Sequence, residues 1–170
     1  ESKREVALKI SSKRSINSNM LEDPRKEVAV MYYLSQNNGH DNIIKLYDVY
    51  EDPTHYWTVL ELCRGGEFFD KIANNGALGE EGAKPYFRQL VSAVQYMHDR
   101  KVCHLDLSLE NLLLKDAEEK HSMVCDFGMA RVMQDQLFPG SLTDKPGKLG
   151  YMAPEIYAGS PFDGRQCDIW

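Results

Sequence analysis

The sequence predicts an α+β fold in which strands come first along the chain and helices follow. Residues Val6 to Ile10 form a short apolar run that is typical of a buried strand. Residues 43–50 and 55–62 are rich in aromatic and β-branched side chains, and Asp52-Pro53 between them indicates an antiparallel hairpin. From Phe68 onward, apolar residues recur at helical spacing. Strands and helices are therefore segregated along the chain.

The first helix is expected to begin at Pro24 and to run to about Ser35. Asp23 suits the N-cap, and proline suits the first helical position. Glu27 lies at the edge of the apolar stripe of this helix. A carboxylate buried there would need a cationic or hydrogen-bonding partner, because an unpaired buried charge is costly. The helix alone favours the alternative, a solvated glutamate at the rim.

A connector and two further helices follow the hairpin. Gly65-Gly66 breaks the strand pattern and suits a connector between two lobes. One helix is expected at 68–75, closed by Gly76, and a longer one at 82–100. These boundaries divide the chain into an N-terminal part at 1–62, a hinge at 63–67 and a C-terminal part at 68–170.

Composition limits the classes of function. The 170 residues are 42% hydrophobic and 27% charged, as in an ordinary folded protein. The net charge of −6 argues against nucleic-acid binding, which needs a basic field. No apolar run approaches the ~18 residues of a membrane helix, so no membrane contact is expected. The four cysteines lack metal-type spacing, which favours free thiols in the cytoplasm.

Four short motifs occur in a fixed order. Lys9 closes the first strand, and Asp106 precedes Asn111 by five residues. Asp126-Phe127-Gly128 follows a strand-like run, and Ala153-Pro154-Glu155 closes the loop that begins there. Each motif is common by itself. Together, and with these gaps, they resemble the catalytic domain of a eukaryotic protein kinase.

The resemblance implies a two-lobed protein-kinase fold. The sequence starts inside a strand-like run and ends at Asp168-Ile169-Trp170 without a terminating signal. We therefore expect the fold to be truncated at both ends, without the strands of the glycine-rich loop and without the C-terminal helices. On that basis the chain alone is expected to have weak activity or none.

The resemblance also implies ATP and Mg²⁺ as cofactors and a role for each motif residue. Lys9 would hold the α- and β-phosphates, and Glu27 would orient Lys9. Asn111 and Asp126 would bind Mg²⁺ through hard oxygen ligands. Asp106 would accept the proton of the substrate hydroxyl.

Alignment of the connector implies further nucleotide contacts. Leu60 resembles the residue beside the adenine pocket, and the backbone of Glu61 and Cys63 would hydrogen-bond adenine. Glu67 would reach the ribose, and Leu113 is assigned to the same nucleotide site. Without the resemblance, Leu60 and Cys63 would be interpreted as ordinary core residues.

Other positions resemble the internal scaffold of the family. Gly128 would let the backbone turn so that Asp126 faces the metal. Asp168 resembles the helix residue that anchors the backbone of the catalytic loop. The apolar stack that aligns the two lobes would comprise Met31, Leu46, His104 and Phe127.

The sequence departs from the family at three positions. Leu105 replaces the usual Arg that binds an activation-loop phosphate, which argues against strict control through candidate sites such as Ser141 and Thr143. Ser108 replaces the usual Lys, and Lys148 replaces the usual Thr. We hypothesise that the Lys148 ammonium substitutes for the missing cation near the transferred phosphate. The alternative is a solvated loop lysine beside a neutral change at Ser108.

The predicted function is transfer of the γ-phosphoryl group of ATP to a Ser or Thr hydroxyl of a protein substrate. Residues 65–70 resemble the calcium/calmodulin-dependent group of Ser/Thr kinases. Glu67 and Glu110 resemble acidic positions that receive Arg of basic substrates. The alternative is a pseudokinase that serves as a scaffold or binding module. An unrelated metal-dependent or hydrolytic enzyme finds no motif support.

Overall fold

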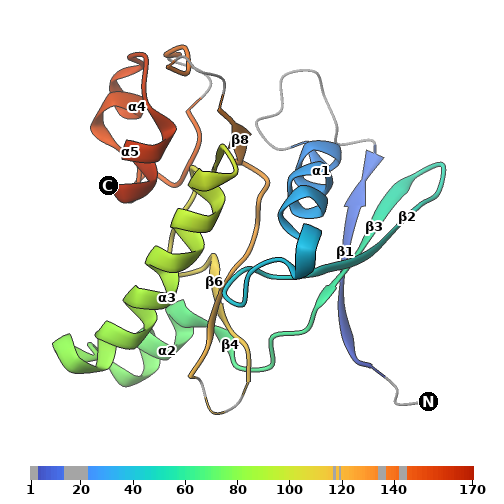
Figure 1. The fold of residues 1–170 in the computed structure, drawn as a ribbon, viewed down its shortest axis with the longest axis horizontal. Coiled ribbons are helices and arrows are strands. Elements are labelled where there is room, and N and C mark those ends of the chain that lie inside the picture. Colours follow the sequence, from blue (N-terminus) through green and yellow to red (C-terminus); the bar gives the residue numbers. More distant parts are fainter. Residues whose placement is uncertain (1–3, 14–22, 117, 119, 134–136, 142–144) are drawn as a thin grey trace.

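The computed structural model describes residues 4–13, 23–116, 118, 120–133, 137–141 and 145–170. A twisted sheet with one helix forms the N-terminal part, and helices with short strands form the C-terminal part (Figure 1). The α+β class predicted from the sequence is therefore confirmed.

The N-terminal sheet contains three antiparallel strands in the order β1-β3-β2, namely β1 (Val6–Ser12), β2 (Leu46–Glu51) and β3 (His55–Glu61). The hairpin of β2 and β3 confirms the prediction, but β2 begins at Leu46 rather than at residue 43. Ile43 and Ile44 are buried and pair elsewhere, since the Ile44 amide donates to the Val124 carbonyl at 2.9 Å. The assignment of these two residues to the hairpin strand was therefore wrong.

The helix α1 (Pro24–Leu34) lies against this sheet (Figure 1). The Asp23 carboxylate accepts a hydrogen bond from the Arg25 amide, as an N-cap does, and Ser35 is the C-cap. Both predicted ends of the helix are therefore confirmed. A short 3₁₀ turn, η2 (Gln36–Asn38), follows before the chain enters the sheet.

Two helices begin the C-terminal part. The helix α2 (Phe68–Asn75) ends at Gly76, whose φ of 78° suits glycine, as predicted. The long helix α3 (Gly79–Asp99) starts before the predicted residue 82, with Glu80 and Glu81 in its first turn, where carboxylates interact favourably with the helix dipole.

Short strands connect these helices to the rest of the chain. A three-stranded sheet has the order β4-β6-β7, formed by β4 (Gly66–Glu67), β6 (Leu112–Leu114) and β7 (Ser122–Val124). A second pair consists of β5 (Val102–Cys103) and β8 (Arg131–Val132). The helices α4 (Pro154–Ala158) and α5 (Gly164–Ile169) close the described fold. Strands of two or three residues are too short for a periodic pattern, and of these only β7 was expected.

One apolar cluster joins the N-terminal and C-terminal parts. Met31 and Leu34 of α1 and Phe127 are almost fully buried in it, together with Met97 of α3. His104 packs on Phe127 with ring centroids 5.0 Å apart. The predicted stack residue Leu46 is half-buried against the same cluster.

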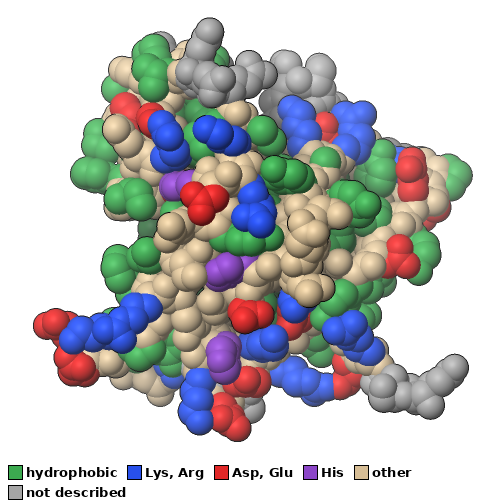
Figure 2. All heavy atoms as spheres, viewed as in Figure 1, with side chains coloured by type: hydrophobic (Ala, Val, Ile, Leu, Met, Phe, Trp, Pro, Cys, Tyr) green, Lys and Arg blue, Asp and Glu red, His purple; other side chains and the backbone are tan. Residues whose placement is uncertain are grey.

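The surface carries both signs of charge. Figure 2 shows Lys and Arg interspersed with Asp and Glu over one face, and hydrophobic side chains gathered over α4 and α5. Among the described residues, no helix is both long enough and apolar enough to cross a membrane.

The backbone at Gly65 approaches β6 too closely for a side chain. Its amide donates to the Leu114 carbonyl at 2.9 Å, and a Cβ here would lie 2.5 Å from the Asp116 carbonyl oxygen. The connector therefore requires glycine for its contact with β6.

We expect Gly65→Ala to lower the free energy of unfolding of the full-length protein by about 1–3 kcal/mol, because overpacking strains the backbone contact. Thermal unfolding measures the effect. Gly150→Ala is the matched control, since a Cβ there meets nothing within 4 Å. Equal unfolding midpoints for the two variants would contradict the expectation.

Candidate active site

Lys9 and Glu27 form an ion pair between the sheet and α1. The Lys9 Nζ lies 2.6 Å from Glu27 Oε1, and Glu27 is only 7% exposed. The interpretation of Glu27 as a solvated rim residue is therefore wrong, because a lysine on β1 supplies the partner that burial requires. Burial, the largest single influence, lowers the pKa of Lys9, but the charges and hydrogen bonds of Glu27 and Asp126 together outweigh it, so that the pKa of Lys9 is raised and the ammonium is stabilised.

Asp126 extends this pair to the C-terminal part. Its Oδ1 lies 3.4 Å from Lys9 Nζ and accepts a long hydrogen bond from the Gly128 amide at 3.3 Å. Asp126 itself has a φ of 60°, whereas the φ of Gly128 is not positive. The sharp turn that presents the carboxylate therefore lies at Asp126, and the expected turn at Gly128 is corrected. Phe127 next to it is buried in the apolar cluster, which fixes this geometry.

Asp168 of α5 anchors the loop at 104–111 that carries Asp106, the expected catalytic loop. The Asp168 carboxylate accepts backbone hydrogen bonds from His104 at 2.9 Å and Leu105 at 2.7 Å. His98 of α3 adds a ring nitrogen at 2.8 Å, and the Asp168 side chain is fully buried. Three partners thus stabilise one buried carboxylate, which would otherwise be costly to bury.

His98 was missed by the sequence analysis. The sequence offered one signal for His98, its place in the last turn of a long helix, where a His interacts favourably with the helix dipole. His98, Cys103 and Asp168 hold their ligand atoms within 4.8 Å of one another. The hydrogen bonds of Asp168 to His98 and to the loop backbone give this cluster a structural role.

His104 links the catalytic loop to the Asp126 turn. Its Nε2 lies 3.0 Å from the Cys125 carbonyl, which accepts only, so Nε2 carries the hydrogen. Its Nδ1 then accepts a hydrogen bond from the Asp106 amide at 3.3 Å. One buried imidazole therefore positions both Asp106 and the residue before Asp126.

Asn111 lies directly beside Asp106. Its Nδ2 donates to the Asp106 carbonyl and to Asp106 Oδ2, both at 2.7 Å. The amide nitrogen is thereby used, and the amide oxygen is left for a cation. The Asn111 amide oxygen and the Asp126 carboxylate are both hard oxygen ligands, a type that fits Mg²⁺.

The predicted nucleotide residues lie along the connector. Leu60 and Glu61 end β3 and are buried, and the Glu61 amide donates to the Lys45 carbonyl at 2.9 Å. The Glu61 amide is therefore already engaged within the protein. The Glu61 carboxylate pairs with Lys115 at 3.0 Å and points away from that role.

The remaining nucleotide positions cluster near this point. Glu67 and Leu113 are direct partners across β4 and β6, so two residues far apart in sequence meet. Cys63 and Cys125 are half-buried, and burial raises the pKa of Cys63 to about 11 and that of Cys125 to about 12. All four cysteines are free thiols, as the sequence predicted.

The Leu105 side chain lies in an apolar environment. It is buried in a cluster that includes Ala153, Ile156, Phe162 and Cys167. The loop therefore uses this position for packing. Of the two candidate phosphorylation sites, Ser141 is half-buried, and Thr143 lies outside the described residues.

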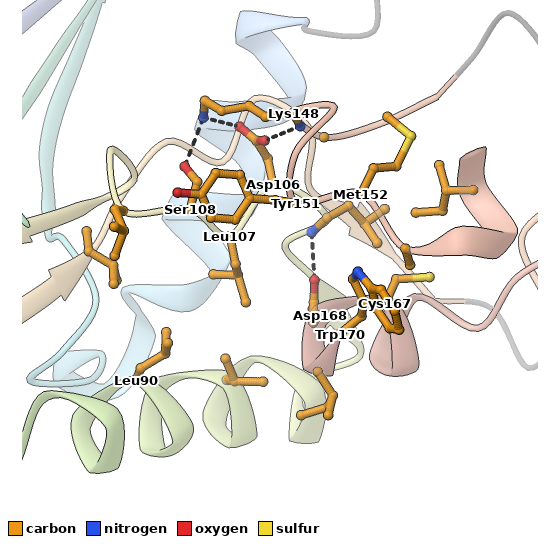
Figure 3. Close-up of a pocket in the computed structure, with 18 of the residues that line it drawn as sticks. Leu90, Asp106, Leu107, Ser108, Lys148, Tyr151, Met152, Cys167, Asp168 and Trp170 are labelled. Carbon is orange, nitrogen blue, oxygen red and sulfur yellow. Dashed lines mark hydrogen bonds and ion pairs between the residues drawn. The ribbon is translucent and has the colours of Figure 1, made fainter. Parts of the chain in front are cut away.

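Lys148 contacts the catalytic loop at the rim of a cavity of about 560 Å³ (Figure 3). Its Nζ lies 2.9 Å from Asp106 Oδ2 and 3.0 Å from Ser108 Oγ, and its amide donates to Asp106 Oδ1 at 3.0 Å. Burial, the largest single influence, lowers the pKa of Lys148, but the hydrogen bond to Asp106 and the nearby carboxylate charges together outweigh it, so that this pKa is raised. The ammonium is therefore a fixed positive charge beside Asp106.

Comparison with known proteins decides the family. The protein kinase domain family matches the chain over residues 1–170. The chain belongs to the protein kinase domain family. It is 42% identical to putative CBL-interacting protein kinase 27 of Oryza sativa subsp. japonica, over 98% of this chain and 40% of that protein. It is 40% identical to CBL-interacting serine/threonine-protein kinase 26 of Arabidopsis thaliana, over 97% of this chain and 36% of that protein.

The kinase domain described here spans about two fifths of the length of these curated relatives. The predicted resemblance to a Ser/Thr protein kinase and the two-lobed kinase fold are both confirmed by the family and its relatives. The structure brings Lys9, Glu27 and Asp126 together, and it places Asp106 and Asn111 in direct contact.

We expect Asp168→Asn to lower the free energy of unfolding of the full-length kinase by about 1–3 kcal/mol, because one acceptor oxygen becomes an NH₂ group facing backbone donors. Hydrogen exchange should show lost protection at the His104 and Leu105 amides. Asp163→Asn on the same helix is the control, because asparagine keeps the N-cap bond to the Arg165 amide. Unchanged protection at both amides would contradict the anchoring role.

Proposed function

We propose that the protein transfers the γ-phosphoryl group of ATP to a Ser or Thr hydroxyl of a protein substrate. The observation that carries this proposal is the Lys9–Glu27 pair beside Asp126, with distances of 2.6 and 3.4 Å from one ammonium. These residues come from β1, α1 and the turn after β7. A cation held between two carboxylates at such a junction is suited to a polyphosphate and its metal.

The nucleotide and metal would be held by residues from both parts of the fold. Lys9 would contact the α- and β-phosphates, oriented by Glu27. Asn111 Oδ1 and the Asp126 carboxylate would hold Mg²⁺. The bound metal would neutralise negative charge on the phosphate oxygens. The carbonyl of Glu61, the backbone of Cys63, and the side chains of Glu67 and Leu113 would surround the nucleoside.

Asp106 would accept the proton of the attacking hydroxyl. Its backbone is tied to His104 Nδ1, and its carboxylate is held by Asn111 and Lys148. Phosphoryl transfer leaves little covalent work for the protein, so this fixed orientation is its main contribution.

The name of the relative from Arabidopsis thaliana, a serine/threonine-protein kinase, supports Ser/Thr specificity. Acidic side chains support a basic-directed substrate. Glu67 is exposed. The pKa of Glu110 is lowered by a hydrogen bond from the Glu110 backbone and by one from the Ser108 side chain, and this keeps Glu110 anionic. We also propose a cytoplasmic location, supported by the four free thiols.

The alternative is a pseudokinase that binds nucleotide without transfer. The hydrogen bonds that orient Asp106 and leave Asn111 Oδ1 unused favour catalysis, because a scaffold needs neither. Loss of the usual cation at position 108 favours the alternative, and Lys148 beside Ser108 weakens that objection.

We expect Asp106→Asn in the full-length protein to lower turnover of a basic Ser/Thr peptide by about 100-fold or more, because the proton acceptor is lost. The measurement is phosphate transfer from ATP·Mg²⁺. Binding of ATP should persist, since Asp106 does not hold the nucleotide. Asp70→Asn on the exposed face of α2 is the control. Nucleotide binding without turnover in the wild type would instead establish the pseudokinase.

A further inference from the structure

A single ammonium lies where the substrate hydroxyl would meet its proton acceptor. Lys148 Nζ is 2.9 Å from Asp106 Oδ2 (Figure 3). Among the described residues, no other Lys or Arg forms an ion pair with Asp106. Lys9, the other cation of the site, pairs with Glu27 and Asp126.

Phosphoryl transfer at this point brings negative charges together. The oxygens of the transferred group must approach the Asp106 carboxylate, because that carboxylate receives the proton of the attacking hydroxyl. Two anionic groups repel each other, and a cation fixed between them stabilises the transition state more than the ground state.

We propose that Lys148 is a catalytic residue that contacts the transferred phosphoryl group, and that its ammonium does so from the loop before α4 rather than from the catalytic loop. This inference rests on the proposed function, because it names a further residue of the same site.

The Lys148 backbone holds the ammonium in place. The Lys148 amide donates to Asp106 Oδ1 at 3.0 Å, so backbone and side chain grip the same carboxylate. Gly147 makes this approach possible, because its φ is 100° and a Cβ at this position would lie only 2.8 Å from the Leu105 carbonyl oxygen. A positively charged group that is already in position needs no reorganisation during the reaction.

The ammonium also has capacity for a ligand. It has three N–H donors, and Asp106 and Ser108 use two of them. The Lys148 side chain is 40% exposed, whereas that of Asp106 is 11% exposed. One face of the ammonium is thus open while the other is fixed.

Ser108 explains why the charge can come from position 148. Its hydroxyl accepts from Lys148 at 3.0 Å and also bonds to the Glu110 side chain. The ends of the two side chains therefore occupy adjacent space. A lysine at 108 facing a serine at 148 would place an ammonium in nearly the same region.

The exchange of these two residues is the test. We measure peptide phosphorylation by the full-length protein with Lys148→Ser, Ser108→Lys and the double variant S108K/K148S. Lys148→Ser should lower kcat by about 100-fold, with KM for ATP changed less than about threefold. Ser108→Lys alone should also lower kcat, because two ammonium groups then crowd one carboxylate. The kcat of the double variant should be at least about tenfold higher than that of Lys148→Ser.

Two further variants control for charge and for the loop. Lys148→Arg keeps a cation and should retain more activity than Lys148→Ser. Lys145→Ser removes another lysine of the same loop, one that donates to the Tyr157 carbonyl, and should leave kcat unchanged. Thermal unfolding and ATP binding establish that each variant is folded.

Each outcome bears on one proposal. A folded Lys148→Ser variant with unchanged or raised kcat would overturn this inference, and the raised value would identify the ion pair as an inhibitory mask over Asp106. A double variant no better than Lys148→Ser would overturn it as well. Absence of turnover in the wild type would overturn the proposed function itself.

Discussion

The buried carboxylate of Asp168 is the interaction on which the site depends. It has no exposed surface, so each of its oxygens must be satisfied by protein donors. It binds the amides of two successive loop residues, and one of these, Leu105, has a φ of 64°. Left-handed backbone costs roughly 1 kcal/mol for such a residue, and the paired hydrogen bonds offset that cost. The two hydrogen bonds thereby fix the backbone just before Asp106 and so orient the Asp106 side chain.

The N-terminal part is connected to this loop by packing and by charge. Phe127 and Met31 share one apolar cluster, and the His104 ring packs on Phe127 at a tilt. Lys9 reaches across from β1 to both Glu27 and Asp126. Apolar packing holds the N-terminal and C-terminal parts together but is not directional. The ion pairs of Lys9 define the orientation of the two parts. Displacement of α1 would separate Glu27 from Lys9 and would also disturb the packing of Phe127.

Local chemistry predicted the local features of this fold. Asp23 and Pro24 defined the start of α1, and Gly76 defined the end of α2, because capping depends on neighbouring residues only. The candidate catalytic and metal positions were proposed from ordered motifs in the sequence, and the structure places Asp106 in contact with Asn111. Features that depend on distant partners were not predicted by local chemistry. The helix alone placed Glu27 at the rim, because its partner Lys9 comes from another element, and only the family resemblance paired the two.

The same limit applies to the strands and to the anchors. Ile43 and Ile44 have the composition of a hairpin strand, yet their hydrogen bonds go to the chain at Val124, far along the sequence. His98 was not identified because nothing near it in the sequence marks the burial of Asp168. Contact between Lys148 and Ser108 was only a hypothesis until the loop before α4 was placed against the catalytic loop. Because that loop carries the cation, moving it would change the local charge that the proposed nucleotide would meet beside Asp106 and Asp126. Loop position and nucleotide affinity are then thermodynamically linked, and each must alter the other by the same factor.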